Sequence, residues 1–195
     1  MLLDVFRKFN WVDIFVIISL VRIGYVSFKT GFTIELFKLL GIILATYISL
    51  HYYIRFSDLI FHQGASSEKM PVEFSDFISF MLLAIAGYMF FVLLRSVFYR
   101  FMKMEAAPTL QKWGGLVLGM VRGFLFVGLI TFMFVTSSIA YLKDSVQSSY
   151  SGSSTFKIAP STYSWIWNNL SSKFMDNEKF NQTVIEVQEK ESPKQ

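Results

Sequence analysis

Four long, mainly apolar stretches dominate this sequence. They are WVDIFVIISLVRIGYVSF (11–28), FTIELFKLLGIILATYISLHYYI (32–54), DFISFMLLAIAGYMFFVLLRSVFY (76–99) and a fourth that covers 113–136. A helix needs about 20 mainly apolar residues to cross a bilayer, because roughly 30 Å of hydrocarbon is crossed at about 1.5 Å per residue. We therefore expect an all-α integral membrane protein whose four transmembrane helices lie within residues 1–137.

The composition supports the same class of protein. Hydrophobic residues make up 53% of the chain and aromatic residues 18%, more than a soluble domain of this size needs. The chain has no cysteine, which excludes disulfides, thiol catalysis and cysteine-based metal sites. The formal net charge is +4, but the basic residues are scattered beside the apolar stretches. We interpret them as charges that flank a membrane, and we expect no nucleic-acid partner.

The first two apolar stretches are separated only by Lys29, Thr30 and Gly31. A connection this short predicts a tight antiparallel helical hairpin. Gly31 is the residue that can take a positive φ in such a turn, because it has no Cβ to clash with the backbone.

The two longer connections differ in charge. Residues 55–76 are polar and mildly acidic, whereas residues 95–112 are distinctly basic. Because Lys and Arg are enriched in cytoplasmic connections, we expect 95–112 and the turn at Lys29 to lie inside. Both termini and the acidic connection then lie outside. Arg7 and Lys8 favour the opposite orientation.

Residues 138–195 form a polar, serine-rich tail beyond the last apolar stretch. Aromatic and aliphatic residues spaced through 161–174 predict a short amphipathic helix in the membrane interface, where indole rings favour the headgroup region. A loosely packed tail with a few apolar anchors fits the same pattern. The final segment EVQEKESPKQ, residues 186–195, is predicted to be disordered.

The fourth apolar stretch carries a charge beside a stripe of glycines. At about 100° per residue, Gly115, Gly119 and Gly123 fall within about 80° of one another, and Arg122 lies about 20° from the edge of that set. Small residues spaced by four allow helix backbones to approach closely in lipid. A charged side chain costs at least about 2.5 kcal/mol in hydrocarbon, so Arg122 should face protein or water. We therefore expect this face to pack against another helix.

Glu35 is the expected partner of Arg122, because the topology places both in the same leaflet, with Arg22 and Lys38 within reach. An ion pair would satisfy the donors of the guanidinium. Three interpretations stay open: a structural charge cluster, snorkelling of Arg122 to the headgroups, and a pathway for ions or protons. The acidic side chain of Glu35 also favours a helix N-terminus.

The chain shows no pattern that predicts catalysis or cofactor binding. His51 and His62 have no carboxylate or thiol at metal-ligand spacing, so we expect no metal site. Serines are frequent in the tail, but no nucleophile elbow or base partner accompanies them. Phosphate-binding loops and dinucleotide fingerprints are absent from the sequence. We therefore expect no enzyme, no catalytic residues and no cofactor.

Three motifs together resemble the bacterial colicin V production protein family. They are WVDIFVII with Asp13, KTGFTIELFKLLG with Gly31, Phe32, Glu35 and Gly41, and GGLVLGMVRGFLFV with Gly115, Gly119, Arg122 and Gly123. The resemblance covers roughly residues 11–137, and the tail is a looser likeness. It implies a multi-pass helical protein of the bacterial inner membrane, linked to production or export of colicin V and to envelope functions, with no defined catalytic activity.

Two hypotheses about function follow from these observations. The first is a non-enzymatic accessory or scaffold protein that self-associates through the glycine face and works with other membrane or secretion components. The second is a subunit of a small oligomeric channel or transporter, in which Arg122, Glu35 and Arg22 line a water-filled path. Both predict a homo-oligomer in the lipid bilayer. Transport would require one, because four helices leave a monomer little room for a pore.

Overall fold

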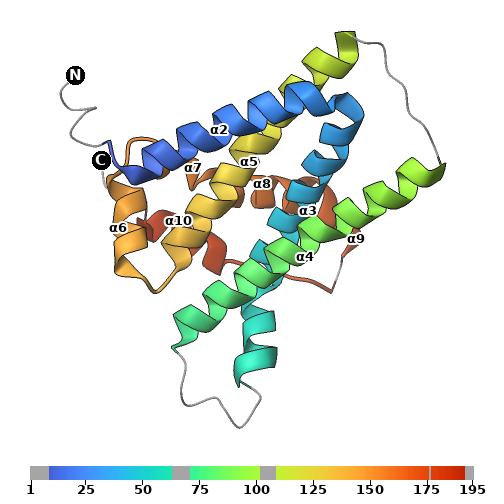
Figure 1. Ribbon diagram of the computed structural model, residues 1–195. Coiled ribbons are helices and arrows are strands. Elements are labelled where there is room, and N and C mark those ends of the chain that lie inside the picture. Colours follow the sequence, from blue (N-terminus) through green and yellow to red (C-terminus); the bar gives the residue numbers. More distant parts are fainter. Residues whose placement is uncertain (1–8, 63–70, 102–108, 176, 192–195) are drawn as a thin grey trace.

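The computed structural model describes residues 9–62, 71–101, 109–175 and 177–191 (Figure 1). Within these ranges all regular structure is helical and no strand occurs. Four helical segments are long and apolar enough to span a membrane: Trp11–Thr30, Phe32–Phe61, Val72–Phe98 and Leu110–Thr136. The predicted fold class, an all-α protein with four membrane-spanning helices, is confirmed.

Counted with the π-helical turns that adjoin them, the four helical segments are longer than the apolar stretches that predict them. Their bounds are α2 (Trp11–Thr30), α3 (Phe32–Ser57), α4 (Val72–Phe101) and α5 (Gly115–Thr136), with π-helical turns at Asp58–His62 and Leu110–Gly114. Hydropathy marks the part of a helix that crosses hydrocarbon, whereas helical hydrogen bonding continues into polar flanks. α4 thus begins at Val72 with Glu73 in its first turn, where a negative charge suits the helix dipole.

Gly31 forms the turn between α2 and α3. It has φ +86°, and its N–H donates to the Ser27 carbonyl at 3.2 Å, so the predicted positive φ is present. The two helices diverge from this turn and contact each other little beyond it (Figure 1). α5 packs against both of them, and α4 lies along α3. The turn is therefore tight, but the arms of the predicted hairpin are separated by α5.

The C-terminal region is a folded part of the molecule. Its elements are α6 (Ala140–Ser148), α7 (Gly152–Thr155), α8 (Ile158–Ile166), a π-helical turn (Trp167–Ser171), α9 (Ser172–Phe174) and α10 (Thr183–Glu191). α8 packs against α3 and α5, and α6 and α7 also contact α2 (Figure 1). Phe156, Tyr163 and Val184 are fully or almost fully buried in the same core as Leu50 and Phe132 of the spanning helices. A loosely packed tail is therefore the wrong picture for this region.

The predicted amphipathic helix over 161–174 corresponds to α8, the following π-helical turn and α9. Its buried side contains Tyr163 and Ile166, which face the core shared with α3, while Trp165 and Phe174 are exposed. The exposed aromatic side has the character expected of a surface in the membrane interface.

The predicted disorder over 186–195 is corrected for the residues up to Glu191. They belong to α10, in which Val184 is buried. The carboxylate of Glu191 forms an ion pair with Lys143 Nζ, with 2.6 Å between Nζ and Oε1. The Gln147 side chain also donates to Glu191. These long-range contacts order a segment whose composition alone predicts disorder. Residues 192–195 lie outside the described part of the chain, as do residues 63–70 and 102–108 of the two connections whose charge sets the predicted orientation.

A hydrogen-bond network fastens the C-terminal region to α3. The Tyr163 hydroxyl accepts from the Asn181 N–H at 2.9 Å and is hydrogen-bonded to His51 Nδ1 at 2.8 Å. Asn181 Nδ2 donates to the Leu50 carbonyl at 2.7 Å. Burial raises the pKa of Tyr163 to about 12, so this side chain stays protonated. The His51 ring also stacks on Trp167, with 5.2 Å between ring centroids.

Acidification is expected to weaken the contact between Glu178 and α3. Arg55 Nη1 donates to Glu178 Oε2 at 2.5 Å, and this hydrogen bond lowers the pKa of Glu178 below its usual value of 4.5. A carboxylate whose pKa is lowered in the folded state stabilises the fold above its unfolded-state pKa, and that stabilisation is lost as the pH falls through the lowered value. Below about pH 4.5 the Tm of the natural protein should therefore fall more steeply than that of Glu178→Gln. Identical profiles would contradict this assignment.

Candidate functional site

The glycine stripe of α5 lies against α2 of the same chain. A Cβ on Gly115 would come within 2.8 Å of the Ser27 carbonyl oxygen and 2.9 Å of the Gly31 carbonyl carbon. A Cβ on Gly119 would overlap the Ser27 side chain, and one on Gly123 would come within 3.0 Å of Leu20. The backbones of α2 and α5 therefore approach closely because these positions lack side chains. We call this contact the glycine seam.

The glycine seam corrects one part of the scaffold hypothesis. Gly115, Gly119 and Gly123 are all buried within a single chain, because α2 covers them. The prediction that this face packs against a helix and not against lipid is confirmed. The same contact leaves the face unavailable to a second copy of the protein, so self-association through the glycines is wrong.

Glu35 lies beside Gly119, the middle glycine of the seam, and is fully buried. Its Oε2 accepts from Arg122 Nε at 2.9 Å, and its Oε1 accepts from Lys38 Nζ and from Thr30 Oγ1, each at 2.6 Å. Arg122 Nη2 also reaches Ser27 Oγ at 3.4 Å. The donors come from α2, α3 and α5, so one carboxylate joins three helices. Glu35, Lys38, Arg122, Thr30 and Ser27 are called the Glu35 cluster below.

Local sequence explains how these side chains meet. Lys38 follows Glu35 by one helical turn, a spacing that brings two side chains to the same face of α3. Thr30 reaches Glu35 across the Gly31 turn, since the two residues are only five positions apart. Arg122 comes from a distant helix, and Gly119 gives it access because it allows α5 to lie close to Ser27. The side chain of Arg122 is only 11% exposed. This is the geometry of a structural charge cluster, and it differs from that of an arginine snorkelling to the headgroups.

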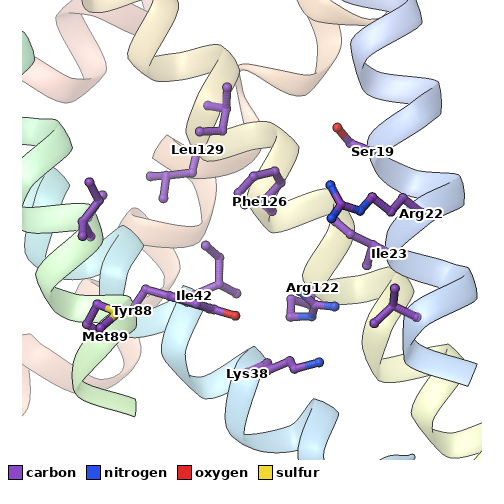
Figure 2. Close-up of a pocket in the computed structure, with 14 residues that line it drawn as sticks. Ser19, Arg22, Ile23, Lys38, Ile42, Tyr88, Met89, Arg122, Phe126 and Leu129 are labelled. Atoms are coloured by element: carbon purple, nitrogen blue, oxygen red, sulfur yellow. The ribbon is translucent and has the colours of Figure 1, made fainter. Parts of the chain in front are cut away.

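Arg22 does not join the Glu35 cluster. It is exposed on α2, and within the described part of the chain it has no ion-pair partner. It nevertheless points from α2 toward the same space that Lys38 and Arg122 line (Figure 2). The expectation that all four charged residues form one cluster is thus corrected. Arg22 shares a cavity with two of them and an ion pair with none, because its side chain leaves α2 on the side away from Glu35.

The cavity has a volume of about 480 Å³ and lies between the four spanning helices (Figure 2). Apart from Arg22, Lys38, Arg122, Ser19 and the hydroxyl of Tyr88, its walls are apolar. The apolar lining consists of Ile23, Val26, Ile42, Ala84, Ile85, Met89, Phe126, Leu129 and Ile130. It is partly open to its surroundings. A concave space of this size at the junction of helices is typical of a binding site.

Asp13 forms a second polar anchor, at the other end of α2. It caps this helix by accepting from the Asn10 N–H at 3.0 Å, and it is 2% exposed. Its oxygens also accept from the Ser151 N–H at 2.7 Å, the Ser151 hydroxyl at 2.5 Å and the Tyr150 N–H at 3.3 Å. The turn between α6 and α7 is therefore held by a carboxylate 138 positions away. Sequence analysis places Asp13 at the start of a helix but misses this contact, since no local pattern signals it.

Asp13→Asn is expected to lower the free energy of unfolding by about 2 kcal/mol, because a buried carboxylate that serves several donors is replaced by a neutral amide with one oxygen. Reversible unfolding in mixed micelles measures the change. Asp144→Asn is the matched control, since Asp144 is exposed on α6. Equal stability of the two variants would contradict the role of Asp13 as an anchor.

No group of three His, Asp or Glu side chains that could hold a metal ion occurs in the described ranges. His51 belongs instead to the aromatic contact between α3 and α8, and its Nδ1 is occupied by Tyr163. The side chain of His62 lies outside the described part of the structure. The arrangement as a whole offers close helix packing, a neutralised carboxylate and a cationic cavity.

A family model described as Colicin V production protein matches residues 12–177. The match extends past the spanning helices into the C-terminal region, so it contains Asp13, Glu35 and Arg122 together with Ser151 and α8. Comparison with curated proteins and with solved structures gave no match.

Proposed function

Because that match covers most of its length, the chain belongs to the colicin V production protein family, and on this premise we propose that it acts as a non-enzymatic scaffold in the bacterial inner membrane. Membership of the family supports a role in colicin V production. In the proposed role the protein holds a fixed helical frame in the lipid bilayer. Toxin-exporting or envelope-maintaining membrane components assemble on this frame.

The observation that carries the proposal is the burial of Glu35 together with its hydrogen bonds to donors from three helices. Each carboxylate oxygen is occupied by donors from neighbouring helices, and the side chain is fully buried. A carboxylate held in this way locks α2, α3 and α5 together, and its burial keeps it away from a substrate. Removing Glu35 leaves Arg122 and Lys38 without their counter-charge, so the frame depends on this carboxylate.

A scaffold also needs surfaces for partners. α4 offers a long exposed apolar face that includes Leu82, Phe90, Leu93 and Val97. In the proposed assembly this face, and not the glycine seam, contacts lipid, a second copy or another membrane component. Homo-oligomer formation stays part of the proposal on this basis.

Colicin V release from cells that depend on this protein tests the scaffold role. Zones of growth inhibition would be compared with the amount of folded protein in the membrane for a series of packing variants. The scaffold role predicts that toxin release follows the folded amount and that Arg22→Gln, which leaves the Glu35 cluster intact, keeps normal release. Loss of release in Arg22→Gln at normal abundance would contradict it.

The cavity favours a second candidate, a subunit of a small channel or transporter. Three cationic side chains line a space at membrane depth, as an anion path would require. Flux of chloride or phosphate from liposomes that contain purified protein separates the two roles. Robust conductance that Arg22→Gln abolishes, with the assembly retained, would overturn the scaffold proposal.

The proposed orientation places the basic connection in the cytoplasm and the C-terminal region outside. The chain has no natural cysteine, so single cysteines report accessibility directly. A membrane-impermeant maleimide added to cells with a permeabilised outer membrane should label Tyr150→Cys and leave Lys112→Cys unlabelled. Both side chains are exposed in the folded protein, so each serves as the other's control. The reverse labelling pattern would invert the orientation.

A further inference from the structure

The cavity between the spanning helices holds more positive than negative charge. Arg22, Lys38 and Arg122 reach into it from α2, α3 and α5 (Figure 2). Of the described carboxylates, the one that contacts any of these cations is Glu35, and it pairs with Lys38 and Arg122. Three cations and one carboxylate leave a net charge of +2. Arg22 in particular has no counter-charge within the described ranges.

This excess charge lies deep in the membrane. Arg22 follows Trp11 by eleven positions and precedes Thr30 by eight, which places it about 16 Å and about 12 Å from the two ends of α2. A cation at such depth is costly unless it meets an anion, backbone carbonyls or water. The position of Arg22, together with the net positive charge of the cavity, therefore calls for a negatively charged group inside it.

The walls of the cavity suit the apolar part of the same ligand. α4 contributes Ala84, Ile85 and Met89, while α5 contributes Phe126 and Ile130. α2 and α4 both line the cavity and contact each other little, which leaves an opening between them, and their exposed side chains on this side include Ile18, Val21, Ile85 and Met89. An opening bordered by exposed aliphatic side chains of two spanning helices faces hydrocarbon. A ligand that enters there has to be an amphiphile.

We propose that the cavity binds the phosphate group of an anionic membrane lipid. Arg22 and Arg122 donate to the phosphate oxygens, Lys38 adds a third positive charge, and an acyl chain lies along Ile85 and Met89 of α4. Guanidinium groups bind phosphate through paired N–H donors, and basic pockets between membrane helices are suited to anionic headgroups. A volume of about 480 Å³ holds a headgroup and the first part of a chain. The site goes beyond the scaffold role and does not depend on it.

Native mass spectrometry of the full chain in a neutral detergent tests the site, with dioleoylphosphatidylglycerol as the probe and dioleoylphosphatidylcholine as the zwitterionic comparison. The expected result is one saturable phosphatidylglycerol adduct and much weaker binding of phosphatidylcholine. Arg22→Gln should raise the apparent Kd for phosphatidylglycerol about tenfold, the loss expected for a charge-assisted hydrogen bond. Lys112→Gln removes an exposed cation outside the cavity and should leave the Kd unchanged.

Two further measurements identify the part of the lipid that is recognised. Met89→Trp fills the apolar wall and leaves all three cations in place, so it should weaken lipid binding as well. Inorganic phosphate should compete poorly, because it lacks an acyl chain. Full competition by phosphate together with unchanged binding in Met89→Trp would overturn the lipid in favour of a small anion. Equal lipid binding by Arg22→Gln and Lys112→Gln would overturn the site itself. The site would also be overturned if the protein formed a dimer that the substitution Arg22→Gln dissociates.

Discussion

Glu35→Gln is expected to lower the free energy of unfolding by about 4 kcal/mol and to cause the largest loss of any single substitution in the spanning helices. The carboxylate is fully buried and joins Arg122 at 2.9 Å and Lys38 at 2.6 Å. A neutral amide leaves two cations at membrane depth without a counter-charge, which is more costly than removing the whole pair. Reversible unfolding in mixed micelles measures the change.

A double-mutant cycle shows whether the loss arises from the pair. Arg122→Gln alone should also destabilise the protein, while the double variant Glu35→Gln/Arg122→Gln should lose less than the sum of the two. Glu73→Gln is the control, because Glu73 is an exposed carboxylate in the first turn of α4. Exchanging the two charges is a poorer test, since an arginine at position 35 would lie beside Lys38. Additive effects of the two single substitutions would show that the contact carries no coupling energy.

Gly119→Ala is expected to destabilise the protein by about 3 kcal/mol, although alanine is a better helix former than glycine. The added Cβ would overlap the Ser27 side chain, so α5 has to move away from α2. That movement also lengthens the contact between Arg122 and Ser27, which is 3.4 Å in the intact seam. The free energy of unfolding in mixed micelles and the amount of protein inserted in membranes should both fall.

Ser27→Gly provides the rescue for this substitution. It removes the atoms that the new Cβ would overlap, so Gly119→Ala/Ser27→Gly should recover most of the lost stability. Gly24→Ala is the matched control in the same helix pair, since its Cβ would meet the flexible Met120 side chain at 3.4 Å. A Gly24→Ala variant as unstable as Gly119→Ala would show that glycine is needed for some reason other than the seam.

The glycine stripe on α5 shows which features of the packing helical periodicity can predict and which it cannot. Spacing by four places Gly115 and Gly119 on one face, and the cost of a charge in hydrocarbon requires Arg122 to avoid lipid. Both arguments are local, and both agree with the structure. Neither identifies the facing helix. That helix is α2 of the same chain. Because α2 covers the glycine face, a second copy of the protein cannot bind there.

Arg22 and Asp13 show that contacts between distant elements cannot be predicted from a local sequence pattern. Arg22 resembles Arg122 in sequence, yet the rotation of α2 about its axis turns it into the cavity and away from Glu35. Asp13 is readable as a helix cap, while its contact with Ser151 joins residues 138 positions apart. The packing of α8 against His51 is equally long-range.

The four spans, the positive φ of Gly31 and the need to bury one face of α5 can all be predicted from the order of the residues, because hydropathy, backbone sterics and helical periodicity act on neighbouring residues. Three further outcomes come from packing: Glu35 joins three helices, Arg22 is left to line a cavity, and the serine-rich region is folded. These outcomes depend on the relative rotation and distance of elements far apart in the chain, which no local pattern of residues encodes.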